Sequence, residues 1–339
     1  MTPAELPERL AAAGHRELAQ RIRLDHPVAA LTTYRVGGAA AAFIVAEQAD
    51  DLVRLGRTLG RFPLRVVVLG RGSNVLIGER GISGLVVQLG DGFAVIDATG
   101  ANELEPGEVD TSERVEVMAG GAALLPVVAR KSVAGGLAGF EWAVGVPGSI
   151  GGAVRMNAGG HGSDMAASLH RVRVIDLAGG EDEVMAADTI ELGYRHSNLR
   201  ATQVVVSATL LLERGDRARS ESELAEIVRW RRDHQPGGQN AGSVFRNPGG
   251  SADSAGALID QAGCRGLRIG SAEVSTKHAN FMQVDPNGRA DDVVVLMAAV
   301  RERVRQHCGV SLVAETHVFG VDRDTCEAAG AVWRDGGGP

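Results

Sequence analysis

The sequence predicts an α+β protein with two or three domains, for three reasons. First, the chain has 339 residues, of which 44% are hydrophobic and 23% charged, which is typical of a soluble protein with more than one core. Second, candidate strands and helices interleave without a strict strand–helix–strand repeat, which disfavours a single doubly wound sheet. Third, residues 139–160 form a glycine-rich, almost uncharged segment around which we expect the domains to be organised.

Charge and cysteine content disfavour several classes of protein. A net charge of −7 argues against bulk attraction to nucleic acid or to an anionic membrane. Cys264, Cys308 and Cys326 are scattered without a Cys-x-x-Cys pair, which suits a reducing cytosol and predicts no metal site. Glu5 and Glu8 interrupt the apolar core that a signal peptide needs, and no apolar run is long enough to span a membrane. We therefore expect a cytoplasmic, monomeric protein without nucleic-acid or membrane partners.

The first part of the chain is expected to combine helices with short strands. Residues 4–22 have an amphipathic pattern that predicts one packing helix. Asp50 is a candidate N-cap for a helix over residues 51–60. Strands are expected where apolar and β-branched residues gather, at 41–45, 64–69 and 84–89.

A Gly/Ser/Asn turn over residues 70–78 follows the second of these strands. Such a turn makes backbone N–H groups available to a pyrophosphate. Gly70 and Gly72 begin a G-x-G-x-x-G pattern, but Val75 occupies the third glycine position, and no G-K-[S/T] follows. The turn is therefore neither a Rossmann fingerprint nor a P-loop. A phosphate-binding turn and a plain tight turn between strands both remain open.

Residues 139–160 contain seven glycines. Glycine loses the most backbone freedom on folding, so a dense run is worth ordering only where the backbone approaches a ligand or adopts positive φ. A linker would be polar, whereas here Phe140, Trp142, Val144 and Ile150 separate the glycines. This pattern favours a buried backbone cradle for a cofactor phosphate over a spacer.

The rest of the chain continues the alternation of strands and helices. Ser220 and Glu223 form a capping box, and Ser254 precedes a helix that Gly263 ends. Strands are expected at 114–119, 170–177, 183–187, 203–213, 281–284 and 312–319, and helices at 122–134, 220–232, 254–263 and 291–306. Residues 99–113 are polar and acidic and predict a surface loop, and residues 336–339 predict a disordered tail.

Six segments, taken in order, resemble the motifs of one family, the UDP-N-acetylenolpyruvoylglucosamine reductases of bacterial cell-wall synthesis (MurB). Residues 33–38, 70–76 and 141–159 are similar to the family's flavin motifs, and residues 193–197, 241–248 and 312–315 to its catalytic motifs. The resemblance covers residues 25–320. Only 47 residues, without a tyrosine, separate Arg195 from Ser243, so the chain resembles the shorter form of the family, which lacks a tyrosine-bearing insertion.

The resemblance also implies a fold. It is an FAD-binding domain of the vanillyl-alcohol-oxidase (PCMH) type in two subdomains, followed by an α+β substrate-binding domain. The implied bounds are 1–88, 89–215 and 216–325, with a tail at 326–339.

The cofactors implied by the resemblance are FAD and NADPH. The matching positions for FAD are Tyr34, Arg35, Val36, Gly70, Arg71, Gly72, Ser73, Asn74, Val75, Leu76, Ala143, Gly145, Val146, Pro147, Gly148, Ser149, Gly152, Ala153, Asn157 and Gly159.

The implied reaction reduces UDP-N-acetylenolpyruvoylglucosamine to UDP-N-acetylmuramate for peptidoglycan precursor synthesis. NADPH reduces FAD, and hydride then passes from reduced FAD to the β-carbon of the enolpyruvyl group. Carbanion character develops next to the substrate carboxylate, where fixed charges stabilise it best. By resemblance, Arg195 binds this carboxylate, protonated Glu315 polarises it, and Ser243 donates the final proton.

Each of these three residues also has a plain structural interpretation, which the residues alone leave open. Arg195 suits a salt bridge at a strand end, and Glu315 suits an edge carboxylate facing water. Ser243 suits a turn hydroxyl bonded to nearby backbone, and no G-x-S-x-G elbow surrounds it.

Positions that match the family's substrate-binding residues are Tyr194, Arg195, His234, Asn247, His278 and Glu315. His234 stands where the family commonly has lysine, and a histidine at a helix end also fits a solvated surface position. His317 replaces the arginine of the family's Glu-x-Arg.

Two other functions compete with the reductase. A flavin oxidase would be favoured by a histidine or cysteine for covalent flavin attachment, and residues 139–160 contain neither. A non-catalytic nucleotide-sugar-binding protein would be favoured by loss of Ser243, Arg195 or Glu315, and all three are present.

Overall fold

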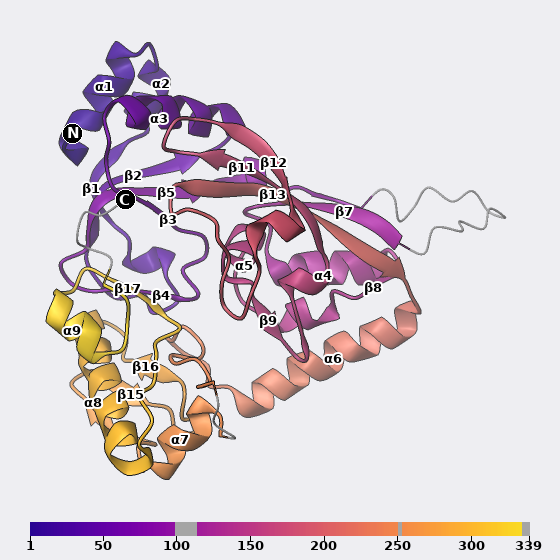
Figure 1. Cartoon of the computed structure of the whole chain (residues 1–339), viewed down its shortest axis with the longest axis vertical. Coiled ribbons are helices and arrows are strands. Elements are labelled where there is room, and N and C mark those ends of the chain that lie inside the picture. The colour runs from indigo at the N-terminus through magenta and orange to yellow at the C-terminus, as the bar shows by residue number, and fades with distance from the viewer. Residues whose placement is uncertain (99–113, 250–252, 334–339) are drawn as a thin grey trace. The chain divides into compact units, whose positions relative to one another are not determined.

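A computed structural model describes residues 1–98, 114–249 and 253–333 of the chain (Figure 1). The loop expected at 99–113 and the tail expected at 336–339 lie outside the described residues. The chain forms two compact units, each assembled from three separate stretches. The first unit consists of Met1–Ile22, Ile44–Gly70 and Val86–Arg231, and the second of Arg23–Phe43, Arg71–Leu85 and Arg232–Pro339. The division at 1–88, 89–215 and 216–325 stays a prediction.

An antiparallel sheet forms the centre of the first unit. The long strand β13 (Gln203–Arg214) lies between β11 (Leu169–Asp176) and β7 (Arg114–Gly120). The remaining strands are β12 (Asp182–Ala186) beside β11, β6 (Ile96–Asp97) beside β7, and β8 (Leu137–Ala138), which pairs with β13.

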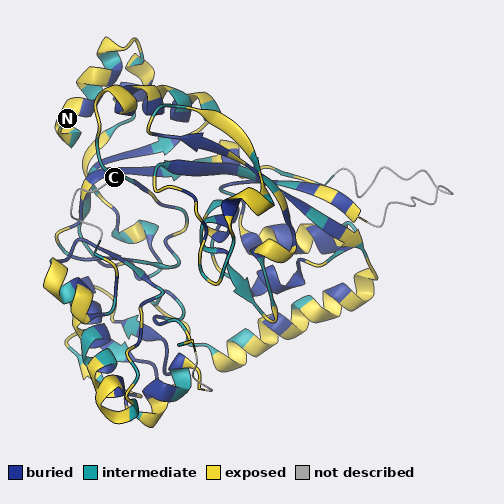
Figure 2. Cartoon of the chain, viewed as in Figure 1, coloured by how far each residue is buried: buried dark blue, intermediate teal, exposed yellow. Residues whose placement is uncertain are grey.

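Helices pack on this sheet, which explains why β13 is buried along most of its length. α3 (Ala49–Arg61) contacts β11, and α5 (Ile150–Met156) contacts β13. α4 (Leu125–Ala134) packs against the short helix η5 (Glu141–Gly145). Figure 2 shows β13 and most of β11 as buried, whereas β12 and the part of α6 that belongs to this unit are largely exposed. α6 spans Arg217–His234.

The single helix expected over residues 4–22 is wrong. A 3-10 turn (η1, Pro3–Glu5) leads into α1 (Leu6–Ala12), and α2 (Arg16–Gln20) follows a break. Gly14 lies at this break with φ +86°, a left-handed conformation that ends helices and that glycine adopts without strain. Two short helices result, which bury Leu6, Leu10 and Leu18.

The start of α3 also differs from expectation, because Gln48 is the N-cap and Asp50 lies in the first turn. Asp51 takes over the capping role, since its Oδ2 accepts the backbone N–H groups of Glu47 at 2.8 Å and Gln48 at 3.2 Å. Arg21 donates to both carboxylate oxygens of Asp51, at 3.1 and 2.8 Å.

In the second unit, helix α8 (Ala290–Cys308) supplies much of the core. Its buried residues Val293, Met297, Val300 and Val304 recur every three or four positions and form one apolar face. It packs on β14 (Arg268–Ile269), β15 (Ala272–Val274) and β16 (Met282–Val284), which form an antiparallel sheet, and on α7 (Ala255–Gln261) and α9 (Arg323–Ala328). Gly309 ends α8 with φ +70°.

Early segments of the chain complete the second unit. β4 (Val75–Ile77) pairs in parallel with β17 (His317–Phe319), and β1 (Arg23–Pro27) pairs with the start of β2 (Ala39–Ala46). β5 (Ile82–Leu89) continues from this unit into the first, where Leu69 N–H, just after β3 (Val66–Val68), donates to Val87 O at 2.9 Å.

The strand expected over residues 312–319 forms only at β17. Ahead of it, Ala314 N–H donates to Gly330 O at 2.9 Å and Glu315 N–H to Val244 O at 2.7 Å. Residues 313–315 therefore make one isolated antiparallel bridge, between Ala314 and Phe245, which does not extend into a ladder. Glu315 lies in an irregular stretch beside this bridge.

Candidate active site

The glycine-rich segment 139–160 folds as a compact turn in the first unit. After η5 the chain turns at Gly148, which has φ +133°, and enters α5. Ile150 N–H donates to Ala123 O and Gly151 N–H to Gly121 O, both at 2.9 Å. The segment is therefore fixed to the end of β7 and the start of α4, as a rigid cradle requires.

Two of the motifs that resemble flavin motifs meet in this unit. A Cβ on Gly70 would lie only 2.8 Å from Ser149 Oγ, so the backbone at Gly70 runs directly against the cradle. On α5, a Cβ on Gly152 would meet nothing nearer than Ser149 Oγ at 4.0 Å, and Gly152 is exposed. Close backbone approach at Gly70 and open backbone at Gly152 are what a large bound cofactor needs. These residues fit FAD.

The other flavin-like segment meets Gly72 in the second unit. Thr33 donates to Gly72 O from both its N–H, at 3.2 Å, and its Oγ1, at 3.3 Å. Gly72 has φ +58°, and a Cβ there would lie 2.5 Å from Leu31 O. No side chain can be accommodated at Gly72, so the turn depends on glycine.

Three of the positions expected to bind FAD are core residues of the second unit. Tyr34, Val36 and Leu76 are at most 4% exposed and belong to the core of the second unit. Burial raises the pKa of the Tyr34 phenol. The Tyr34 hydroxyl makes no hydrogen bond within the described part of the chain. These three residues can offer a cofactor little beyond their backbone.

Ser243 and Glu315 lie on neighbouring, hydrogen-bonded segments of the second unit. Glu315 N–H donates to the carbonyl of Val244, the residue after Ser243, at 2.7 Å. Asn74 Nδ2 donates to Glu315 O at 3.2 Å, and His317 N–H donates to Asn74 O at 3.0 Å. The segments of two predicted catalytic residues and one predicted FAD residue are thus linked through hydrogen bonds to backbone groups.

Asn280 organises the Ser243 segment, and the sequence interpretation missed it. Its Oδ1 accepts the N–H of Phe245 at 2.9 Å, its Nδ2 donates to Phe245 O at 2.8 Å, and its backbone O accepts the N–H of Val244 at 2.9 Å. Asn280 is 3% exposed. A lone amide between apolar Ala279 and Phe281 was the available signal, because buried polar groups are hydrogen-bonded.

Three of the predicted substrate-binding residues of the second unit differ in their exposure and hydrogen bonds. Asn247 is exposed, and its Oδ1 accepts the N–H of Ala255 at the start of α7 at 3.0 Å. Burial, together with the charge of Arg265, lowers the pKa of His278 and favours a neutral ring. His278 Nδ1 accepts the N–H of Asn280 at 3.3 Å, so the ring proton is on Nε2. His234 is exposed at the end of α6.

Arg195 and Tyr194 belong to the first unit, on a tight turn beside the cradle. Arg195 has φ +55°, and its Nη2 donates to Gly159 O at 3.2 Å. Its guanidinium carbon lies 5.4 Å from the centre of the Tyr194 ring, and Tyr194 is 58% exposed. The guanidinium is therefore fixed on the glycine-rich segment itself.

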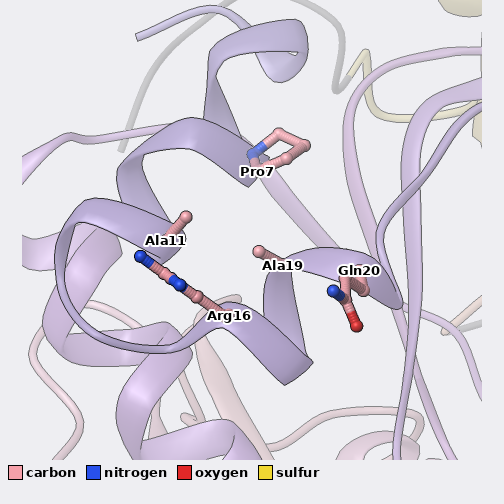
Figure 3. Close-up of a pocket in the computed structure, with 5 residues that line it drawn as sticks. All are labelled: Pro7, Ala11, Arg16, Ala19 and Gln20. Carbon is pink, nitrogen blue, oxygen red and sulfur yellow. The ribbon is translucent and has the colours of Figure 1, made fainter.

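An open pocket of about 340 Å³ between α1 and α2 lies outside these motifs. Figure 3 shows its lining, which is Pro7, Ala11, Arg16, Ala19 and Gln20. Among the described residues, no group of three His, Cys, Asp or Glu side chains could hold a metal ion. No helix in the same part of the chain is long and apolar enough to cross a membrane.

Comparison with family models gives two matches. The model of an FAD binding domain matches residues 40–182. The model described as "UDP-N-acetylenolpyruvoylglucosamine reductase, C-terminal domain" matches residues 234–319. The first match contains the glycine-rich cradle, and the second contains Ser243 and Glu315.

Whole-chain comparisons agree with these matches. A UDP-N-acetylenolpyruvoylglucosamine reductase of Heliobacterium modesticaldum is 39% identical over 93% of this chain and 93% of its own length. A second, from Symbiobacterium thermophilum, is 38% identical over 88% of this chain and 92% of its own. The crystal structure of UDP-N-acetylenolpyruvylglucosamine reductase from Thermus caldophilus superposes with a TM-score of 0.73 and 31% identity, over 88% of this chain and 99% of that one.

These findings confirm the α+β fold with an FAD-binding domain that the sequence motifs implied. The similarity extends over nearly the whole chain rather than over one domain. The chain belongs to the UDP-N-acetylenolpyruvoylglucosamine reductase family.

Proposed function

We propose that this protein reduces UDP-N-acetylenolpyruvoylglucosamine to UDP-N-acetylmuramate, with FAD as cofactor and NADPH as reductant. The main support for the proposal is that the Ser243 and Glu315 segments are paired. Glu315 N–H donates a hydrogen bond to Val244 O at 2.7 Å. A proton donor and an acid that polarises the substrate carboxylate are required together in this reaction. Family membership over 93% of the chain supports the same substrate.

The residues that would hold FAD are the cradle around Ser149 and Gly152 and the turn at Gly70 to Asn74. When bound, FAD supplies a two-electron store that takes hydride from NADPH and passes it to the enolpyruvyl double bond. The cradle's contribution is a backbone surface that no side chain blocks. Its close packing against the β7–α4 connection keeps that surface preorganised.

Arg195 would bind and orient the substrate carboxylate. A guanidinium is planar and permanently charged, and it matches a carboxylate with two parallel hydrogen bonds. Its bond to Gly159 O at 3.2 Å fixes its direction before substrate arrives. Negative charge that grows on the carboxylate during reduction then meets a cation that has no need to move.

Ser243 would deliver a proton to the carbon next to that carboxylate, and Glu315 would assist in its acid form. A serine hydroxyl is a weak acid, so it transfers its proton only to a strongly basic partner, which an enolate-like carbon is. The serine oxygen then recovers a proton from solvent. Asn280 makes three hydrogen bonds to the backbone of the two residues that follow Ser243. These bonds restrain the position from which the Ser243 hydroxyl would donate its proton.

Tyr194, His234, Asn247 and His278 would complete the substrate site. We also propose a cytoplasmic enzyme, because substrate and reductant are water-soluble nucleotides, and we propose that it is a monomer. Its only partners would then be these small molecules.

An anaerobic spectral titration tests the function. NADPH should bleach the flavin absorbance of the purified protein, and the enolpyruvyl substrate alone should then restore it. Colour that returns only when oxygen is admitted would identify an oxidase instead. A protein that neither contains flavin nor takes up added FAD would contradict the cofactor assignment.

A further inference from the structure

We propose that Asn157 is a positioning residue that holds Arg195 for the substrate carboxylate, rather than a residue that contacts FAD. The proposal rests on the proposed function, because it needs Arg195 to bind that carboxylate. It assigns a different role to a position that the motif comparison placed among the FAD-binding residues.

The side chain of Asn157 is fully engaged inside the protein. Its Nδ2 donates to Asp164 Oδ2 and to Gly193 O, both at 3.0 Å, and its Oδ1 accepts the N–H of Ala166 at 2.9 Å. An asparagine amide has two donor hydrogens, and both are used. The residue is 3% exposed. No donor hydrogen is left for a cofactor.

The bond to Gly193 reaches the base of the turn that carries Arg195. This turn is closed by two backbone hydrogen bonds between Gly193 and His196, each 3.1 Å long. Fixing the Gly193 carbonyl therefore fixes the turn. Arg195 has φ +55°, a conformation that non-glycine residues keep only where their surroundings impose it.

The other end of Arg195 meets the same segment. Its Nη1 lies 3.5 Å from the backbone oxygen of Asn157, and its Nη2 lies 3.2 Å from Gly159 O. Asn157 itself ends α5 in the left-handed region, with φ +39°, which asparagine tolerates better than other side chains. Asn157 thus anchors both the base of the turn and the guanidinium at its tip. Figure 1 shows the two elements on either side of it, α5 and β9 (Gly159–Gly160).

The test is Asn157→Gly, which removes the amide but keeps the left-handed backbone free of strain. Misplacing the guanidinium by about 1 Å should slow flavin reoxidation by substrate on the order of 100-fold. FAD affinity of the apoprotein and flavin reduction by NADPH should stay within about threefold of wild type. Asn287→Gly is the matched control, because Asn287 is exposed and also left-handed, with φ +61°. It should change none of the three quantities.

A double-mutant cycle with Arg195→Gln distinguishes positioning of the guanidinium by Asn157 from a general destabilisation of the site. Once the guanidinium is gone, Asn157→Gly should slow reoxidation by less than about threefold more. Asn157→Asp combined with Asp164→Asn keeps the shape, the acceptor for Ala166 and a donor–acceptor pair between residues 157 and 164, but loses the donor to Gly193. This double variant should show the same slow reoxidation if the glycine variant folds poorly.

Three outcomes would overturn the proposal. If FAD affinity falls by as large a factor as the rate of flavin reoxidation, Asn157 binds the cofactor. If Asn157→Gly slows reoxidation by the same factor with and without Arg195→Gln, Asn157 has a structural role that does not act through Arg195. Normal reoxidation in Arg195→Gln would remove the assigned role of Arg195, and so would show a failure in the proposed function rather than in the Asn157 contacts.

Discussion

The hydroxyl of Ser243 is the group whose removal should separate the two halves of the catalytic cycle. Ser243→Ala should leave flavin reduction by NADPH unchanged, because no proton passes from Ser243 in that step. Reoxidation by the enolpyruvyl substrate should slow by about 10²–10⁴-fold, the usual contribution of a general acid. Anaerobic stopped-flow absorbance measures both rates. Equal slowing of both would refute the proton-donor role.

Ser254→Ala is the control for that variant. Ser254 Oγ caps α7 by accepting the N–H of Ala257 at 3.2 Å. Its loss should cost about 1 kcal/mol of stability and alter neither rate.

Gly152 gives a second prediction for a single residue, because it separates folding from cofactor binding. A Cβ at this position has open space, and alanine favours a helix over glycine by about 0.8–1.0 kcal/mol. Gly152→Ala should therefore fold at least as stably as wild type, as thermal denaturation of the apoprotein would show. Its FAD affinity should fall about tenfold, or roughly 1.4 kcal/mol, if the cofactor packs on this backbone. Unchanged affinity would move the cofactor away from α5.

At the level of elements, the start of α3 predicts a pH dependence of stability. Burial alone would raise the pKa of Asp51, but hydrogen bonds from Arg21 and from the N–H of Glu47 outweigh it and hold the pKa below its ordinary value. A carboxyl with a lowered pKa in the folded state stabilises the protein above its unfolded pKa of about 3.9, and this contribution is lost as the pH falls through the folded pKa.

The variant Asp51→Asn checks this sign. Urea unfolding should show it less stable than wild type at pH 7, with the difference shrinking below about pH 4. A difference that stayed constant down to pH 3 would mean that the ion pair with Arg21 contributes little.

Only some element ends with local signals could be predicted from the sequence. Asp50 and the capping box at Ser220 and Glu223 misplaced the starts of α3 and α6, since Gln48 caps α3 and α6 begins at Arg217. Ser254 and Gly309 mark the ends of α7 and α8 correctly, because a cap needs only neighbouring residues. Gly14 was missed inside an amphipathic pattern that continues across the break. The strand around Glu315 was overestimated because the sequence does not show that its pairing with residues 244–246 stops after one bridge.

The contrast between local signals and distant contacts also applies to the candidate site. Motif residues such as Ser243 and Arg195 could be proposed from the sequence, because their order matches that of the family's motifs. Asn280 and the role of Asn157 could not, because both act through hydrogen bonds to segments distant in the sequence.

For the whole molecule, the second unit should not fold from its C-terminal stretch alone. Tyr34, Val36 and Leu76 belong to its core, and Glu79 accepts the N–H groups of Ala290 at 2.7 Å and Asp291 at 2.9 Å at the start of α8. A fragment of residues 232–339 lacks all four of these early side chains. Its thermal denaturation, followed by circular dichroism, should show no cooperative transition, and a sharp transition would show that the early segments are dispensable.

The three-stretch construction of the second unit also sets the order of events during synthesis. Tyr34 and Leu76 leave the ribosome long before the rest of their core. That part begins at Ala241, some 160 residues after Leu76. At about 5–20 residues per second, these apolar side chains wait roughly ten to thirty seconds for their partners. The nascent chain therefore carries uncovered apolar side chains through much of its translation. A chaperone that binds residues 23–85 at this stage would cover them until the rest of the core is made.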